Sequence, residues 1–149
     1  GKGERPGSQV MRILGLDMGS KRIGVAVSDP LGITAQGLLT LEKEKDGDVI
    51  KHLRDIILKE EIKEIVVGLP LNMNGSYGPQ AKNAISFADS LKDKFDIPVK
   101  LWDERMSTME VERIMIEAGT SRSKRKKKID KLAAQVILQS YLNARGNKL

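Results

Sequence analysis

The chain contains no cysteine and a single histidine, His52, among its 149 residues. The absence of cysteine excludes disulfide bonds, thiolate nucleophiles and cysteine-based zinc sites. Any metal ion would therefore be held mainly by carboxylates, and these oxygen ligands favour Mg²⁺ or Mn²⁺ over zinc.

Aromatic residues and long apolar runs are also scarce. Only 3% of the residues are aromatic, so Trp102 is expected in the core rather than as a platform for stacked bases. The chain has no run of about 18 apolar residues and no signal-peptide pattern, so neither membrane insertion nor secretion is expected. We expect a cytoplasmic protein with no membrane partner, in which His52 lies on the surface of a helix.

The first ten residues differ from the rest of the chain. Residues 1–10 are rich in glycine, polar and without periodicity, and they precede Met11, which has the appearance of a start. We interpret them as a disordered extension or a remnant of cloning. Residues 11–149 are long enough to form a single domain with a hydrophobic core.

The net charge of +6 comes from one short segment. Between Arg122 and Lys131 the local net charge is also +6, so the rest of the chain is neutral. A dense basic cluster on a neutral body is typical of contact with a nucleic-acid backbone, although a solvated loop of like charges is the alternative. Nucleic acid is favoured because the cluster continues directly into an acid, Asp130. The basic residues are Arg122, Lys124, Arg125, Lys126, Lys127, Lys128 and Lys131.

The hydrophobic pattern predicts a mixed α/β domain. Apolar and β-branched runs predict five strands, and residues 13–16 and 23–27 form the first antiparallel pair. Helical periodicity predicts four helices, the third of which opens with a capping box. This order favours a mixed five-stranded sheet flanked by helices. The strands are expected at residues 13–16, 23–27, 33–41, 65–69 and 97–102, and the helices at 47–60, 79–93, 107–118 and 129–144.

Acidic residues occur where these elements end or begin. Asp17 ends the first strand, and Asp103 and Glu104 end the fifth, so they are expected at one edge of the sheet. Asp130 is expected to start the last helix, on the side that also carries its apolar residues. Carboxylates from three elements can hold one or two Mg²⁺ ions for phosphodiester cleavage. Taken singly, each acid has a structural alternative: a turn cap, a strand-end hydrogen-bond acceptor, a solvated loop residue or a helix N-terminal acid.

Four motifs in order resemble the YqgF/RuvX family, which is described as Holliday-junction-resolvase-like. They lie at residues 17–29, at 67–70 with 74–76, at 103–108 and at 129–138, and the resemblance extends over residues 11–145. It implies a ribonuclease H-like fold. It also implies that Asp17, Glu104 and Asp130 are the catalytic and metal-binding residues. Asp103 stays open as an alternative to Glu104, because adjacent residues at a strand end point in opposite directions.

The resemblance implies a metal-dependent nuclease, a hydrolase acting on phosphodiester bonds with Mg²⁺ or Mn²⁺. Its expected substrate is the 5′ end of precursor 16S rRNA, processed during ribosome biogenesis. The alternatives are an endonuclease for Holliday junctions and a nucleic-acid-binding protein without catalysis. The first hairpin also resembles the phosphate-binding hairpin of actin-like sugar kinases and ATPases, but those folds need two such domains and this chain supplies one.

Several basic side chains are candidates for nucleic-acid contact beyond the catalytic acids. Arg105 can bind a phosphate through two N–H groups, and Lys21 and Arg22 in the first turn can act similarly, unless they pair with the acids themselves. The loop at residues 72–78 offers amides and Tyr77 for a sugar or base, or is merely a connection. Expected partners are structured RNA, branched DNA and ribosomal precursor particles, bound by a monomer or a weak homodimer. The predicted nucleic-acid-binding residues are Lys21, Arg22, Arg105, Arg122, Lys124, Arg125, Lys126, Lys127 and Lys128.

Overall fold

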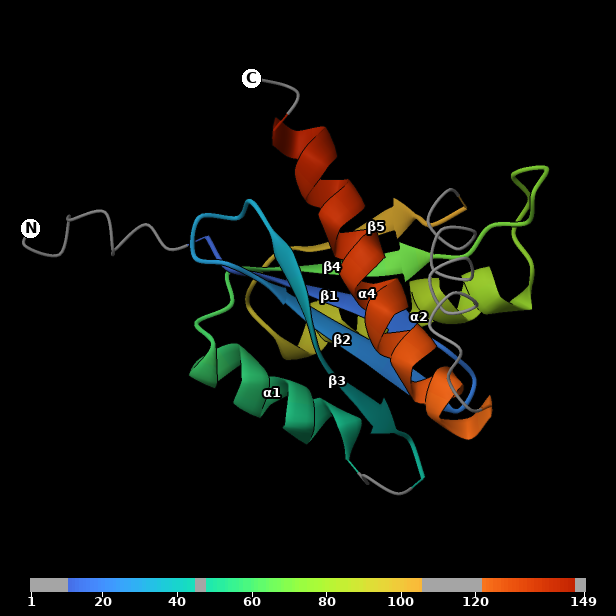
Figure 1. Cartoon of the computed structure of the whole chain (residues 1–149), viewed down its shortest axis with the longest axis horizontal. Helices are drawn as coiled ribbons and strands as arrows, with labels where there is room; N and C mark the ends of the chain where they lie inside the picture. The colour runs from blue at the N-terminus through green and yellow to red at the C-terminus, as the bar shows by residue number, and fades with distance from the viewer. Residues whose placement is uncertain (1–10, 45–47, 106–121, 147–149) are drawn as a thin grey trace, which may run out of the picture.

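A five-stranded mixed sheet forms the centre of the computed structural model, which describes residues 11–44, 48–105 and 122–146, without the side chains of 122–129. The strand order is β3-β2-β1-β4-β5 (Figure 1). The first three strands pair antiparallel, whereas β4 and β5 continue the sheet parallel to β1. The strands are β1 (Ile13–Met18), β2 (Arg22–Ser28), β3 (Ala35–Glu42), β4 (Glu64–Leu69) and β5 (Val99–Asp103).

Helices cover both faces of this sheet. Helix α1 (Val49–Lys59) and helix α2 (Pro79–Lys94) pack on one face, and helix α4 (Arg122–Gly146) crosses the other (Figure 1). Alternate residues along each strand serve the two faces: Leu14 and Leu16 of β1 pack in the core on the α1/α2 side, whereas Ile13 packs against α4. Among the helices of the described ranges, none is long and apolar enough to cross a membrane.

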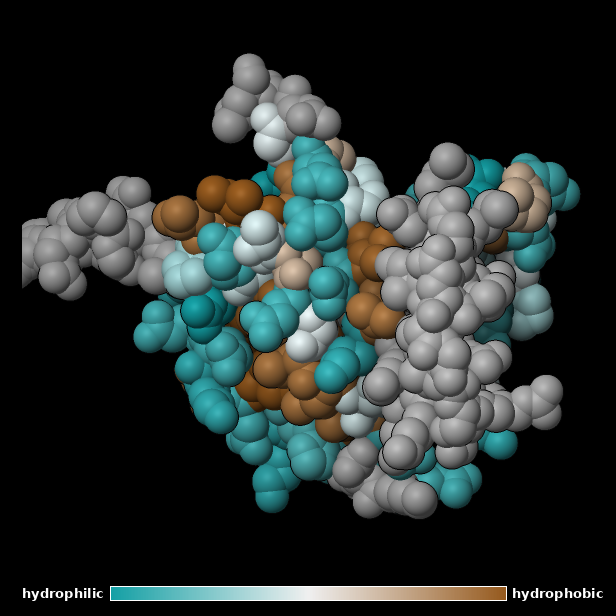
Figure 2. Space-filling view, in the orientation of Figure 1, coloured by the Kyte–Doolittle hydropathy of each residue, from teal (hydrophilic) through white to brown (hydrophobic). Residues whose placement is uncertain are grey.

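Helix α4 packs unusually close to the sheet. A Cβ atom on Gly15 of β1 would lie 2.8 Å from the Cβ of Leu138, and one on Gly37 of β3 would lie 2.6 Å from the Cγ of Lys131. The inner side of α4 is buried through Ala134, Leu138 and other apolar residues, while its outer side is mainly polar (Figure 2). Glycines in the strands thus let one helix lie directly on the backbone of the sheet.

The predicted sheet is confirmed, and so are the two helices predicted between its strands. Among the described elements, the predicted boundaries differ by at most two residues except at one point: the last helix begins at Arg122 rather than near residue 129, and it runs to Gly146. Asp130 therefore lies more than two turns inside α4 and is not the acid that starts it. The helix predicted at residues 107–118 lies outside the described residues.

Candidate active site

Asp17 lies at the end of β1, facing helix α4. It is the second-last residue of the strand, and its cross-strand partner on β2 is Gly24. Since side chains alternate, Asp17 points to the same face as Gly15, against which α4 packs. The hairpin and the long helix together enclose this carboxylate, which is partly buried.

Asp130 lies directly above Gly24, the cross-strand partner of Asp17. A Cβ atom on Gly24 would overlap the backbone carbonyl of Asp130, so only glycine lets α4 lie this low. Asp130 is close enough that its negative charge raises the pKa of Asp17. The hairpin strand and the helix therefore bring these two acids together, although 113 positions separate them in the numbering of the chain.

Glu104 approaches Asp17 from the opposite side. The N–H of Glu104 donates to the carbonyl of Leu69 at 3.2 Å, which ties the residue after β5 to the end of β4. A Cβ atom on Gly68 would lie 2.6 Å from Oε2 of Glu104, so the carboxylate rests above Gly68. Because Leu16 pairs with Val67, Gly68 is level with Asp17 on the neighbouring strand. Glu104 thus lies over β4, while Asp130 lies over β2.

The three carboxylates form one electrostatic unit with Asp17 in the middle. Burial, together with the charge of Asp130, raises the pKa of Asp17 from 3.8 to about 7. Burial, together with the charges of Asp17 and Asp103, raises the pKa of Glu104 from 4.5 to about 8. Raised values of this kind mean that the site favours either protons or a cation at neutral pH.

The donor chemistry of this unit fits a hard divalent cation. Carboxylate oxygens from three separate elements are the ligands that Mg²⁺ and Mn²⁺ prefer. A cation would also relieve the repulsion that raises both pKa values. Within the described ranges, no three acidic or imidazole side chains already lie close enough together to hold one ion. The acids are instead arranged as two neighbouring pairs that share Asp17.

Asp103 and Glu104, which the sequence leaves as alternatives, have separate environments. Glu104 interacts with Asp17, whereas Asp103 points away and binds the Arg105 side chain. The Arg105 guanidinium holds the pKa of Asp103 below its usual range, the opposite direction from Glu104. Adjacent acids at the end of β5 thus face different partners, as strand alternation requires.

The predicted nucleic-acid-binding residues fall in three places. Lys21 is exposed in the β1–β2 turn, and Nε of Arg22 lies 3.7 Å from Oε1 of Glu42 on β3. Arg105 pairs with Asp103 rather than with the three clustered acids. The backbone of residues 122–128 forms the first turns of α4, on the N-terminal side of Asp130. The side chains of Arg122, Lys124, Arg125, Lys126, Lys127 and Lys128 lie outside those described.

Trp102 and His52 have the surroundings that the sequence predicts, whereas the sequence leaves the role of Tyr77 open. Trp102 packs edge-to-face on Tyr141 with ring centroids 5.4 Å apart, and its Nε1 donates to Ser140 Oγ at 3.0 Å, so this partly buried ring packs against the core. His52 is exposed on α1. Tyr77 is half exposed in the β4–α2 loop, so its ring is accessible to a ligand.

Two glycines that the sequence alone does not mark as functional are part of the site. Gly24 makes room for the backbone at Asp130, and Gly68 makes room for the carboxylate of Glu104. A glycine inside a β-strand is a known sign that another group approaches the backbone closely. This signal was present in both strands, but only the structure shows which group approaches.

Comparison with known proteins identifies relatives over almost the whole chain. A family model described as "RuvX: Holliday junction resolvase" matches residues 11–144. A protein of Halothermothrix orenii is 56% identical over 142 residues, covering 93% of this chain and 99% of the relative. One of Clostridium acetobutylicum is 50% identical over 134 residues, covering 90% and 99%. Both carry the name "Putative pre-16S rRNA nuclease".

Solved structures with the same fold are more distant in sequence. The RuvC protein of T. thermophilus, in complex with a Holliday junction substrate, is 14% identical, with a TM-score of 0.52 over 91% of this chain and 96% of that one. The fowlpox virus resolvase, also bound to Holliday junction DNA, is 12% identical, with a TM-score of 0.51 over 91% and 99%. These similarities confirm that this chain has the ribonuclease H-like fold of the resolvases.

Proposed function

The chain belongs to the RuvX family of Holliday junction resolvase-like proteins, and from this we propose that it is a nuclease with Asp17, Glu104 and Asp130 as its active site. Residues 11–149 form the nuclease domain. The observation that carries the proposal is the gathering of three acids from β1, the end of β5 and α4 around Asp17. Clustered like charges destabilise the fold, and the binding of a catalytic cation explains why these acids lie together.

The three acids would hold Mg²⁺ or Mn²⁺. When bound, such an ion activates water and stabilises the leaving oxygen of a phosphodiester. The chain's own contribution is to place these acids on β1, directly after β5 and on α4. Asp17 lies between the other two acids, so it would hold an ion together with Glu104 on the β4 side or Asp130 on the β2 side.

The substrate we propose is structured RNA, specifically the 5′ end of precursor 16S rRNA in ribosomal precursor particles. The names of the relatives at 50% and 56% identity support this choice over DNA. The protein would then act in the cytoplasm, as a monomer or a weak homodimer. Trimming one RNA end needs one active site, whereas cutting a four-way junction symmetrically needs two.

A branched-DNA substrate is the second candidate, supported by the description of the family model. Cleavage of a labelled precursor rRNA and of a four-way DNA junction, measured side by side in Mn²⁺, separates the two candidates. We expect faster cleavage of the RNA. Faster cleavage of the junction would reverse the substrate assignment, and binding without any metal-dependent cleavage would favour a non-catalytic protein.

The active-site assignment is tested by Asp17→Asn, Glu104→Gln and Asp130→Asn. Loss of a residue that merely supports a metal ligand typically costs about 10- to 100-fold, so loss of a ligand should reduce cleavage by at least about 100-fold. Glu60→Gln, on the far side of the sheet, serves as the control and should cleave like the wild type. Circular dichroism checks that each variant is folded, and activity retained in any folded triad variant would remove that acid from the site.

A further inference from the structure

Asp103 and Arg105 form a tight ion pair on either side of Glu104 in the chain. The Nε of Arg105 donates to both carboxylate oxygens of Asp103, at 3.2 and 2.9 Å, and Nη2 donates to Oδ2 at 2.7 Å. The backbone N–H of Arg105 donates to Oδ1 at 3.0 Å. Both oxygens of Asp103 are therefore used by one neighbour. This leaves Asp103 poorly placed as a metal ligand.

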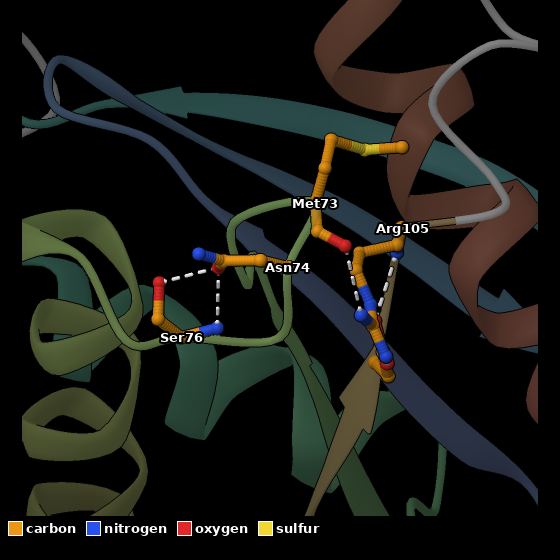
Figure 3. A network of polar contacts seen from close by, with 5 residues as sticks. Met73, Asn74, Ser76 and Arg105 are labelled. Carbon is orange, nitrogen blue, oxygen red and sulfur yellow. Dashed lines mark hydrogen bonds and ion pairs between the residues drawn. The ribbon is translucent and has the colours of Figure 1, made fainter.

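Arg105 also reaches the loop between β4 and α2 (Figure 3). Its Nη1 donates to the carbonyl of Met73 at 3.4 Å, and the same nitrogen lies 3.5 Å from the position of a Cβ on Gly75. The loop is braced internally, because the N–H and Oγ of Ser76 donate to Oδ1 of Asn74 at 3.0 and 2.6 Å. Arg105 is thus held between the end of β5 and a loop that has its own hydrogen bonds.

The remaining donors of Arg105 are suited to an anion. A guanidinium has five N–H groups in a planar fork. Asp103 takes the group on Nε and one on Nη2, and Met73 takes one on Nη1. Within the part of the chain that the structure describes, one N–H on each terminal nitrogen remains available. The side chain is 34% exposed, so this edge is accessible to a phosphate.

We propose that Asp103 is a positioning residue, which holds Arg105 so that the open edge of its guanidinium binds a backbone phosphate next to the active site. This inference rests on the proposed function, since it assigns a substrate contact beside Glu104. A free arginine must lose rotamer freedom when it binds a phosphate, whereas Asp103 has already fixed this side chain. The contribution of Asp103 therefore belongs to substrate binding rather than to the chemical step.

The sign of the Asp103→Asn effect distinguishes positioning from simple electrostatics. Removal of a negative charge near a polyanion should tighten binding if only long-range charge matters. Release of Arg105 from its fixed position should weaken binding. The test compares Asp103→Asn, Arg105→Ala and the double variant for binding of a labelled precursor rRNA in EDTA, followed by cleavage kinetics in Mn²⁺.

We expect each single variant to raise Kd and KM by about 5- to 10-fold, with kcat and the Mn²⁺ concentration for half-maximal rate unchanged. The double variant should bind no worse than Arg105→Ala, because Asp103 acts through Arg105. Arg105→Ala should also lower the salt dependence of binding by about one counterion. Glu60→Gln is the matched control, since it breaks the Arg12–Glu60 pair of 2.8 Å, whose exposure of 29% and 21% is comparable, away from the site.

Binding by Asp103→Asn that equals or exceeds that of the wild type would overturn the inference, as would additive effects in the double variant. A shifted Mn²⁺ requirement would instead make Asp103 a metal ligand and also overturn it. The proposed function fails separately, if the wild type binds the RNA but does not cleave it. In that case the binding measurements in EDTA still decide the role of Asp103.

Discussion

At the scale of single residues, the site combines acids whose protonation differs sharply from that of ordinary carboxylates. Asp17 and Glu104 have raised pKa values because burial and like charges disfavour their ionised forms. Asp103, one residue from Glu104, has a lowered pKa because Arg105 neutralises it. The opposite pKa directions separate the two neighbours: Glu104 interacts with Asp17, whereas Asp103 is paired with Arg105.

The raised pKa values predict how stability depends on pH without metal. A group that binds its proton more tightly in the folded state stabilises the fold at low pH and loses this contribution as pH rises. The free energy of unfolding in EDTA should therefore fall between about pH 4 and pH 8, the window set by the shifts of Asp17 and Glu104. Denaturant unfolding at a series of pH values measures this.

Asp17→Asn provides the comparison for that experiment. The variant should be more stable than the wild type at pH 8 in EDTA, by more than about 1 kcal/mol, and should show a flatter pH dependence. Mn²⁺ at pH 8 should stabilise the wild type but not the variant. A wild-type protein whose stability rises steadily toward pH 8 in EDTA would contradict the assigned pKa directions.

At the scale of secondary-structure elements, the contact of α4 with the sheet sets the position of Asp130. Strand β2 has a glycine where the helix backbone crosses it, and a side chain at this point would collide with the carbonyl of Asp130. The distance between the helix and the sheet is therefore set by glycines that take no part in catalysis. The position of Asp130 depends on Gly24, which lies beneath it.

Gly24→Ala tests this dependence. The added methyl group must push α4 away, which should cost about 1–3 kcal/mol of stability by overpacking and reduce cleavage by moving Asp130. Gly146→Ala is the matched control, because nothing lies within 4 Å of its added Cβ. Thermal unfolding and a cleavage assay measure both effects. Wild-type stability and activity in Gly24→Ala would show that α4 does not rest on this glycine.

The sequence predicts the elements of this fold well, because strand and helix periodicities are local. The sequence does not predict that α4 begins at Arg122, because the run of like charges from Arg122 to Lys128 resembles a solvated loop. The choice between Asp103 and Glu104 also needed the structure. Alternation shows that they face opposite ways, but only the register of β5 on β4 and the partner Arg105 show which one joins Asp17.

At the scale of the whole molecule, charge is distributed in a way that suits a nucleic-acid substrate. The excess positive charge lies in one segment, whose backbone forms the start of α4. The same helix then contributes Asp130, which lies over the hairpin. The basic segment and Asp130, one of the three acids, therefore belong to the same helix, so a nucleic-acid strand bound by the segment would lie near the acidic centre.

Replacing Arg125, Lys126 and Lys127 with glutamine tests this arrangement. Binding of precursor rRNA should weaken, and the slope of log K against log salt should decrease by about 0.7 to 0.9 for each phosphate that these side chains no longer neutralise. The cleavage rate at saturating RNA should change little, because the acids are untouched. Fluorescence anisotropy at several salt concentrations measures the slope. An unchanged slope would exclude the segment from the binding surface.

Asp17, Glu104 and Asp130 should together bind a divalent cation. Anomalous diffraction from a crystal soaked in Mn²⁺ detects such an ion, with an Asp17→Asn crystal treated in the same way as the control. We predict an anomalous peak within about 2.0–2.2 Å of carboxylate oxygens of Asp17 and at least one of the other two acids, absent from the variant. Mn²⁺ bound only elsewhere, or no peak between these acids at saturating Mn²⁺, would show that they do not form a metal site.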